Sequence, residues 1–197
     1  MRKLKSMAGM TLAETLLAVL ILLLASSIVA TGMPAAVSAY RNAIDAANAQ
    51  VLLSAAVNAL RGELSTARDV KASGGTITYT SARTGSRATI SVANDVIVVQ
   101  DYSDLTGESF MQGESGSVTG KKPAPYPLLD AAMRKTTKDG TPMTVTYDTN
   151  GVSVSTDGVI TIPGISVKRG TGSNAAELAK MPPSGLKIRV LTKGAGT

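Results

Sequence analysis

The stretch that decides the fold is GMTLAETLLAVLILLLASSIVATGM, at residues 9–33. Its centre, from Leu16 to Ala25, is an uninterrupted apolar run, and a short basic segment precedes it. At about 1.5 Å per residue, a helix over residues 10–33 is roughly 36 Å long, which is enough to cross the hydrocarbon core of a bilayer. We expect it to anchor the chain in the cytoplasmic membrane as a single pass, with the basic segment inside and the rest of the chain outside.

One carboxylate, Glu14, lies inside the start of this segment. A conventional signal peptide has no use for it, because an unpaired ionised carboxylate at that depth costs several kcal/mol. Cleavage between Gly9 and Met10 would make Glu14 the fifth residue of the shortened chain. The new α-amino group, with an ordinary pKa of about 7.7 to 8.0, would then lie one helical turn away. In an array of packed helices, the carboxylate of one subunit could pair with its neighbour's amine and set the axial register.

This segment resembles the class III prepilin signal of type IV pilins and type II secretion pseudopilins. The resemblance is carried by Gly9-Met10-Thr11-Leu12-Ala13-Glu14 and the apolar residues that follow. It implies that prepilin peptidase removes residues 1–9 and that Met10, where most members have phenylalanine, is N-methylated. It also implies a role for Glu14 in assembly. The implied partners are other pilins or pseudopilins in a filament and an inner-membrane assembly platform.

Beyond the membrane segment, residues 34–71 continue the helical pattern, and we expect one helix from Thr11 to Asp69. Two apolar stripes follow one another on nearly opposite faces. The first consists of Val37, Tyr40, Ile44, Ala47 and Val51, and the second of Leu53, Val57, Leu60 and Leu64. The switch predicts that the proximal half packs against neighbouring helices and the distal half under its own globular domain. The alternative is two helices broken near Pro34.

Residues 72–197 are expected to form a β-rich globular domain. Seven segments alternate as half-buried strands do: Thr76–Ser81, Ala88–Val92, Val96–Gln100, Met143–Tyr147, Val152–Ser155, Val159–Ile162 and Leu186–Leu191. Thr149-Asn150-Gly151 and Thr156-Asp157-Gly158 predict hairpin turns. Glycines and prolines predict a long loop at residues 103–127 and an irregular stretch at 170–185, with a short helix at 128–138 and a mobile tail at 192–197.

The expected fold class is therefore α+β and pilin-like. A long N-terminal helix, with a membrane half at residues 10–33 and an amphipathic half at 34–71, packs against a C-terminal antiparallel β-sheet domain. This arrangement follows from the change of periodicity after residue 71.

Composition removes several classes of chemistry. The chain has no Cys, His or Trp, so it cannot build a disulfide framework, a Cys/His zinc site or a Ser-His-Asp triad. Gly120-Lys121-Lys122 lacks the glycine spacing of a phosphate-binding loop. We expect no enzymatic activity, no cofactor and no metal site.

The net charge of +6 does not by itself indicate a nucleic-acid partner, because Arg2, Lys3 and Lys5 would leave with the leader and lower it to +3. A modest basic patch consists of Lys121, Lys122, Arg134, Lys135 and Lys138. A solvated surface explains this patch better than DNA contact does, since no aromatic residue accompanies it. Weak DNA contact is the functional alternative.

These features predict a minor pilin or pseudopilin, a structural subunit of a pilus, secretion or competence filament that lies at the cell surface after assembly. Residues 60–68, LRGELSTAR, are similar to the pattern of J-type and W-type minor components. The alternative is a secreted or membrane-tethered β-rich binding module, such as an adhesin, with a conventional signal peptide. Val37-Ser38-Ala39 offers a small-residue cleavage site for it.

Overall fold

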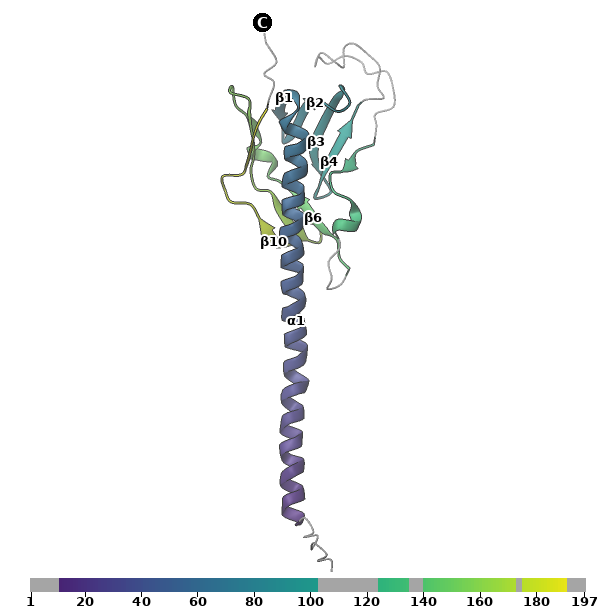
Figure 1. Cartoon of the computed structure of the whole chain (residues 1–197), viewed down its shortest axis with the longest axis vertical. Coiled ribbons are helices and arrows are strands. Elements are labelled where there is room, and N and C mark those ends of the chain that lie inside the picture. Colours follow the sequence, from purple (N-terminus) through teal and green to yellow (C-terminus); the bar gives the residue numbers. More distant parts are fainter. Residues whose placement is uncertain (1–10, 103–123, 135–139, 173–174, 191–197) are drawn as a thin grey trace, which may run out of the picture. The chain divides into compact units, whose positions relative to one another are not determined.

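The computed structural model describes residues 11–102, 124–134, 140–172 and 175–190. It consists of two compact units, Met1–Ala43 and Ile44–Thr197. One α-helix, α1 (Leu12–Ser65), contributes to both units, and all the described strands belong to the second (Figure 1). The expected α+β class, with a long N-terminal helix packed against an antiparallel β-domain, is confirmed.

The first unit contains the apolar half of α1. Every residue from Thr11 to Ala43 is exposed. The most apolar window of the helix has a mean hydropathy of 2.5, and none of that window is buried. By length and composition, α1 is able to cross a membrane. Pro34 lies inside α1 without ending it, so the alternative of two helices broken there is wrong.

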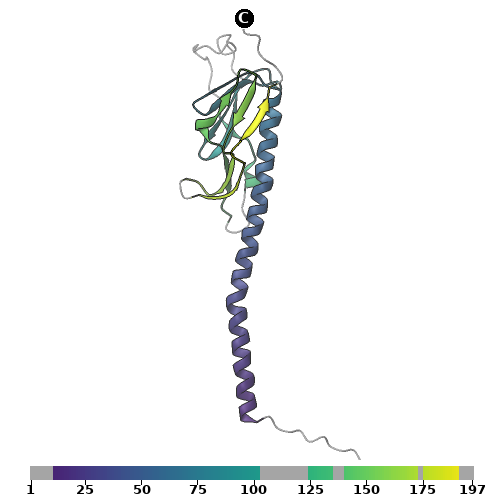
Figure 2. The same cartoon turned by 90° about the vertical axis from the view of Figure 1, so that its left-hand side faces the viewer.

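The second half of α1 supplies one wall of the hydrophobic core. Its buried residues are Asp45, Ala49, Leu52, Leu53, Ala56, Leu60 and Leu64. They recur at steps of one, three and four, which places them on one face of the helix. Figure 2 shows the strands on that one side of this part of α1. The second predicted stripe therefore does face the β-domain, with Val57 at its margin.

The helix ends four residues earlier than expected, at Ser65 rather than Asp69. The chain turns at Ala67, whose N–H donates to the carbonyl of Leu64 at 3.3 Å. Strand β1 (Arg68–Ser73) then begins, and Asp69 has a positive φ of 50°. A helix cannot continue through that left-handed conformation.

The largest sheet is antiparallel, with the order β1-β2-β3-β4-β5. Its other strands are β2 (Thr76–Thr80), β3 (Arg87–Ala93), β4 (Val96–Asp101) and β5 (Tyr126–Pro127). Alternate residues of β2, β3 and β4 are buried: Ile77, Tyr79, Ala88, Ile90, Ile97 and Val99. This period of two is that of a sheet with one face on the core.

Two three-stranded antiparallel sheets complete the domain. One has the order β10-β9-β6 and the other β11-β8-β7. Their strands are β6 (Met143–Thr146), β7 (Ser153–Val154), β8 (Val159–Ile162), β9 (Ser166–Arg169), β10 (Ala176–Lys180) and β11 (Leu186–Arg189). Ile160, Ile162, Val167, Leu186 and Ile188 join the same core as Leu60 and Leu64.

All seven predicted strands are present, and the described residues contain four further strands that the sequence pattern does not predict. Two of the four, β9 and β10, carry the charged sequences SVKR and AELAK, which lack clear alternation. The irregular stretch predicted at 170–185 is therefore wrong where it contains β10. The other two are β1, which begins within the predicted helix, and the two-residue β5, which lies in the predicted loop.

One predicted hairpin is present and the other is not. Gly158 has φ 73° and joins β7 to β8 as expected. Residues 149–151 instead form a short 3₁₀-helix, η2, between strands of different sheets. The short helix expected at 128–138 is described as a 3₁₀-helix, η1, over Ala131–Arg134. Residues 128–130 of that segment are not helical, whereas residues 135–138, most of the predicted loop and the predicted tail lie outside the described residues.

Candidate functional site

The first site feature is the N-terminus of α1, where Thr11 caps the helix. Its Oγ1 accepts a hydrogen bond from the backbone N–H of Glu14 at 3.3 Å. Its carbonyl accepts from the N–H groups of Glu14 and Thr15 at 3.0 and 3.2 Å. Thr11 is thus the N-cap and Glu14 the third helical residue, which are the two positions of a capping box. The T-x-x-E spacing from Thr11 to Glu14 is the sequence signal for this role.

Glu14 is exposed in the first turn of α1. A negative charge at that place is stabilised by the helix dipole. Among the described residues, Glu14 makes no ion pair, so its carboxylate is available to a group from outside this part of the chain. The two predicted processing residues, Gly9 and Met10, lie outside the described residues.

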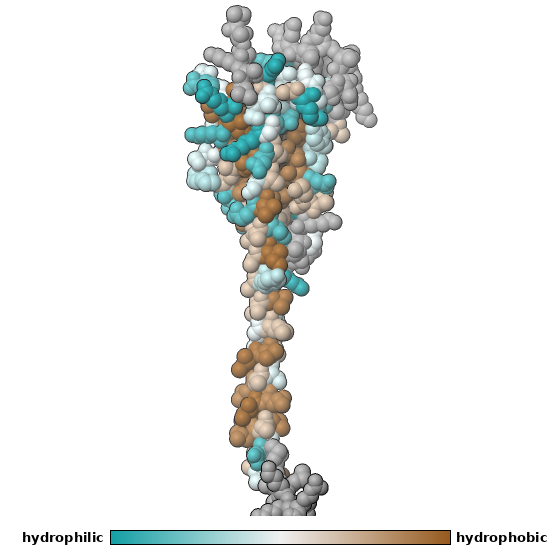
Figure 3. Space-filling model, in the orientation of Figure 1, coloured by the Kyte–Doolittle hydropathy of each residue, from teal (hydrophilic) through white to brown (hydrophobic). Residues whose placement is uncertain are grey.

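The second feature is the exposed apolar surface of α1. Leu16, Leu20 and Leu24 are each at least 55% exposed. Figure 3 shows hydrophobic side chains covering this part of the helix. Soluble monomers rarely expose so large a contiguous apolar surface, which marks a site of contact with lipid or with another protein. Tyr40 and Val51 of the first predicted stripe are also exposed, at 68% each.

A buried ion pair lies near the beginning of the helical segment in the second unit. Asp45 on α1 is fully buried, and its Oδ2 is 2.7 Å from Nη2 of Arg169 on β9. The two residues are 124 positions apart in the sequence. Removing either partner would leave a buried charge uncompensated, so the pair holds this part of α1 in one register against β9.

A second polar network lies between the end of α1 and β2. Glu63 Oε1 accepts hydrogen bonds from Tyr79 Oη at 2.9 Å and from Ser81 Oγ at 3.2 Å. Burial, followed by the negative charge of Glu63, raises the pKa of the Tyr79 hydroxyl well above its ordinary range. Tyr79 therefore stays a neutral donor, which suits a structural anchor for the helix end.

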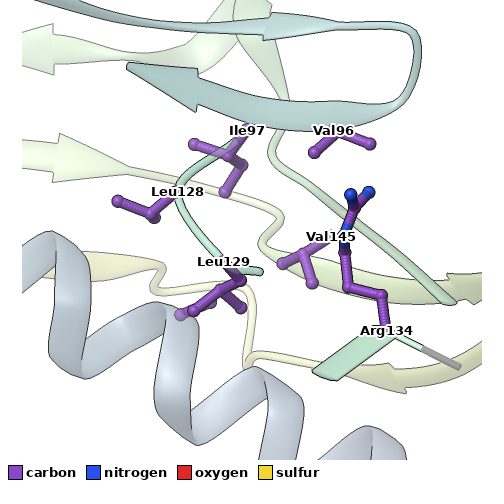
Figure 4. A pocket seen from close by; sticks show the side chains of 7 residues that line it. Val96, Ile97, Leu128, Leu129, Arg134 and Val145 are labelled. Carbon is purple, nitrogen blue, oxygen red and sulfur yellow. The ribbon is translucent and has the colours of Figure 1, made fainter. Parts of the chain in front are cut away.

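The predicted basic patch is described only at Arg134, because Lys121, Lys122, Lys135 and Lys138 lie outside the described residues. The Arg134 side chain lines a small, mostly apolar pocket with residues of α1, β4, β6 and the segment before η1 (Figure 4). The other residues that line it are Ala56, Val96, Ile97, Leu128, Leu129 and Val145. Arg134 Nε is buried there without a hydrogen-bond partner in the described part of the chain.

Comparison with known proteins does not assign the chain to a family: no family model, curated protein or solved structure matches it. Within the described ranges, no group of three or more acidic residues could hold a metal ion. The exposed apolar part of α1, with Glu14 in its first turn, is therefore the best-supported candidate functional site.

Proposed function

We propose that this protein is a structural subunit of a type IV pilus-like or type II secretion filament, a minor pilin or pseudopilin. One observation carries the proposal. No residue in the most apolar window of α1 is buried, and the first turn of the helix carries a lone carboxylate four residues after Met10. A lipid anchor alone explains the apolar surface but not the carboxylate, whereas a packed helical array explains both.

The proposed life of the subunit has two stages. It first lies in the cytoplasmic membrane through α1, with the β-domain outside, and prepilin peptidase removes residues 1–9. The assembly platform then transfers α1 from lipid to contacts with other subunits. Glu14 pairs with the Met10 amine of a neighbouring subunit. This ion pair offsets the free energy that both charges lose when they leave water.

Mass spectrometry of the mature chain tests this proposal. Cells with and without the matching prepilin peptidase are compared, and the expected product begins at Met10 with one added N-methyl group. Gly9→Leu should block processing, and Gly32→Leu is a matched control because Gly32 has open space around it. A chain that begins after residue 39, or one that keeps its leader with the peptidase present, contradicts the proposal.

Assembly is tested with substitutions of Glu14. Glu14→Ala should abolish incorporation into filaments while leaving membrane insertion intact, and Glu14→Asp should retain part of it. Thr11 still caps the helix in both variants, so the N-terminus of α1 is preserved in each. If Glu14→Asp lost as much incorporation as Glu14→Ala, the length of the side chain and not its charge alone would be what assembly requires. Normal incorporation of Glu14→Ala would exclude the proposed charge pair.

The second candidate is a secreted or membrane-tethered binding module. The separate compact unit Ile44–Thr197, with its own core, favours it because such a unit needs no filament to be stable. The product beginning after residue 39 would support this function and exclude the first.

A further inference from the structure

Four cationic side chains line the end of α1 and the strand beside it. We refer to Arg61, Arg68, Lys187 and Arg189 as the β11 cationic surface; all four are exposed. Arg61 is in the last turns of α1, and Arg68 begins β1 three residues after α1 ends. Figure 2 shows β11, in yellow, alongside this part of α1. Hydrophilic side chains gather on the same flank in Figure 3.

The register of β11 directs its cations outward. Leu186 and Ile188 are buried in the core that also holds Leu60 and Leu64. Since side chains alternate along a strand, Lys187 and Arg189 project from the opposite face. Their partners on β8 are Thr161 and Val159, neither of which offers a negative charge.

These four cations make no ion pair or side-chain hydrogen bond within the described ranges. Three other basic residues of the domain, Arg83, Arg169 and Lys180, each face a carboxylate within 4 Å. The nearest acidic residues in the sequence are Glu63, Asp69 and Glu177, and Asp157 lies in the turn before β8, the strand that pairs with β11. Glu63 is engaged by the Tyr79 and Ser81 hydroxyls, and Glu177 pairs with Lys180. The four cations therefore outnumber the two remaining carboxylates, Asp69 and Asp157.

From this arrangement we infer that the β11 cationic surface binds a phosphodiester polyanion. Three of its four cations are arginines, and the planar guanidinium fork matches phosphate better than an ammonium does. The four side chains are spread over two strands and a helix rather than converging on a pocket. A single small anion would meet only one or two of them, whereas a polymer with a repeating charge meets them all. The inference does not depend on filament assembly.

Fluorescence anisotropy with labelled double-stranded DNA tests this inference on the full chain in neutral detergent. A duplex of about 20 base pairs should bind at about 50 mM salt and release steeply as the salt rises. The double variant Lys187→Gln/Arg189→Gln should bind at least about tenfold more weakly, with a logarithmic salt slope shallower by up to about 1.8. Unchanged circular dichroism melting shows that the variant is folded.

The matched control is Arg83→Gln/Lys180→Gln, which removes the same charge at two exposed positions whose cations already face carboxylates. It should keep its affinity within about twofold, because the contacts to phosphate are local. An equal loss in both double variants would mean that net charge alone drives binding and would overturn the inference. So would absence of binding by the wild-type chain, or equal competition by polyglutamate, whose carboxylates lack phosphate chemistry.

Discussion

Residues 12–43 and 44–65 belong to one continuous helix, yet they meet their surroundings differently. In the first segment Leu16 and Leu20 are exposed by 63% and 55%, while in the second Leu52 and Leu60 are exposed by 2% and 0%. The more apolar segment is therefore the one without a partner in the structure. Hydropathy measures the free energy that a segment would gain by leaving water. Only the tertiary structure shows which surface, if any, the segment packs against.

The largest expected effect comes from breaking the ion pair in the second segment. Asp45→Ala leaves Arg169 partly buried without its carboxylate, and we expect the β-domain to lose about 3–5 kcal/mol of unfolding free energy. Urea unfolding of the full chain in neutral detergent, followed by circular dichroism, measures it. The double variant Asp45→Leu/Arg169→Met should recover much of the loss, and a double variant as unstable as Asp45→Ala would show that packing, not charge, is responsible.

The next effect compares one leucine from each segment. Leu60→Ala should destabilise the β-domain by about 2–5 kcal/mol, because it opens a cavity in a fully buried position. Leu20→Ala makes the same chemical change at an exposed position, so the same unfolding measurement should not move. Equal losses in the two variants would contradict the division of the helix into a free and a buried segment.

A smaller effect is expected from Tyr147, whose Oη donates to the carbonyl of Gly75 at 2.7 Å. Tyr147→Phe should lower the unfolding free energy of the β-domain by about 1–3 kcal/mol, because the Gly75 carbonyl loses its hydroxyl partner.

The same tyrosine gives the β-domain a pH dependence. Burial raises the pKa of Tyr147 from 10.0 to about 12. A raised pKa means that the folded state holds its proton longer, so the contribution is complete below about pH 10 and is lost as the pH rises through about 12. Between pH 10 and pH 12, the unfolding free energy of Tyr147→Phe should therefore fall less steeply with rising pH than that of the wild type. Parallel curves would show that Tyr147 does not titrate as the structure implies.

The smallest effect on stability is expected at Val51, which lies in the buried segment of α1 but is 68% exposed. Val51→Ser should change the unfolding free energy by no more than about 0.5 kcal/mol. If its stripe contacts neighbouring subunits, cross-linking into filaments should nevertheless fall. A stability loss as large as that of Leu60→Ala would place Val51 in the core instead.

Much of the fold could be predicted from local pattern. The shift of the apolar stripe before Leu53, the Gly158 turn and the seven alternating segments each depend on residues close together in sequence. The missed strands show where this fails. Strand β10 reads AELAK, a composition typical of a helix, and it becomes a strand because β9 offers an antiparallel edge.

The candidate site divides in the same way. Glu14 and its position relative to Gly9 and Met10 are evident from the sequence. The Thr11 cap can also be predicted from the sequence, through its T-x-x-E spacing. The β11 cationic surface cannot, because Arg61 and Arg189 are 128 residues apart in the chain. The basic patch that the sequence does indicate is that of Lys121 and its neighbours, because a linear pattern displays only charges that are close together in the chain.

The sequence by itself determined a long helix whose first half is apolar on all sides, a carboxylate at its first turn and an α+β chain. Periodicity and composition act over a few residues, and these features need nothing more. Only the tertiary structure decided that Met143–Thr146 and Ser153–Val154 join different sheets, and that Asp45 meets Arg169 across 124 residues. Those choices depend on closing long loops around a shared core, where the gain from burial and charge pairing selects one arrangement among many with similar local patterns.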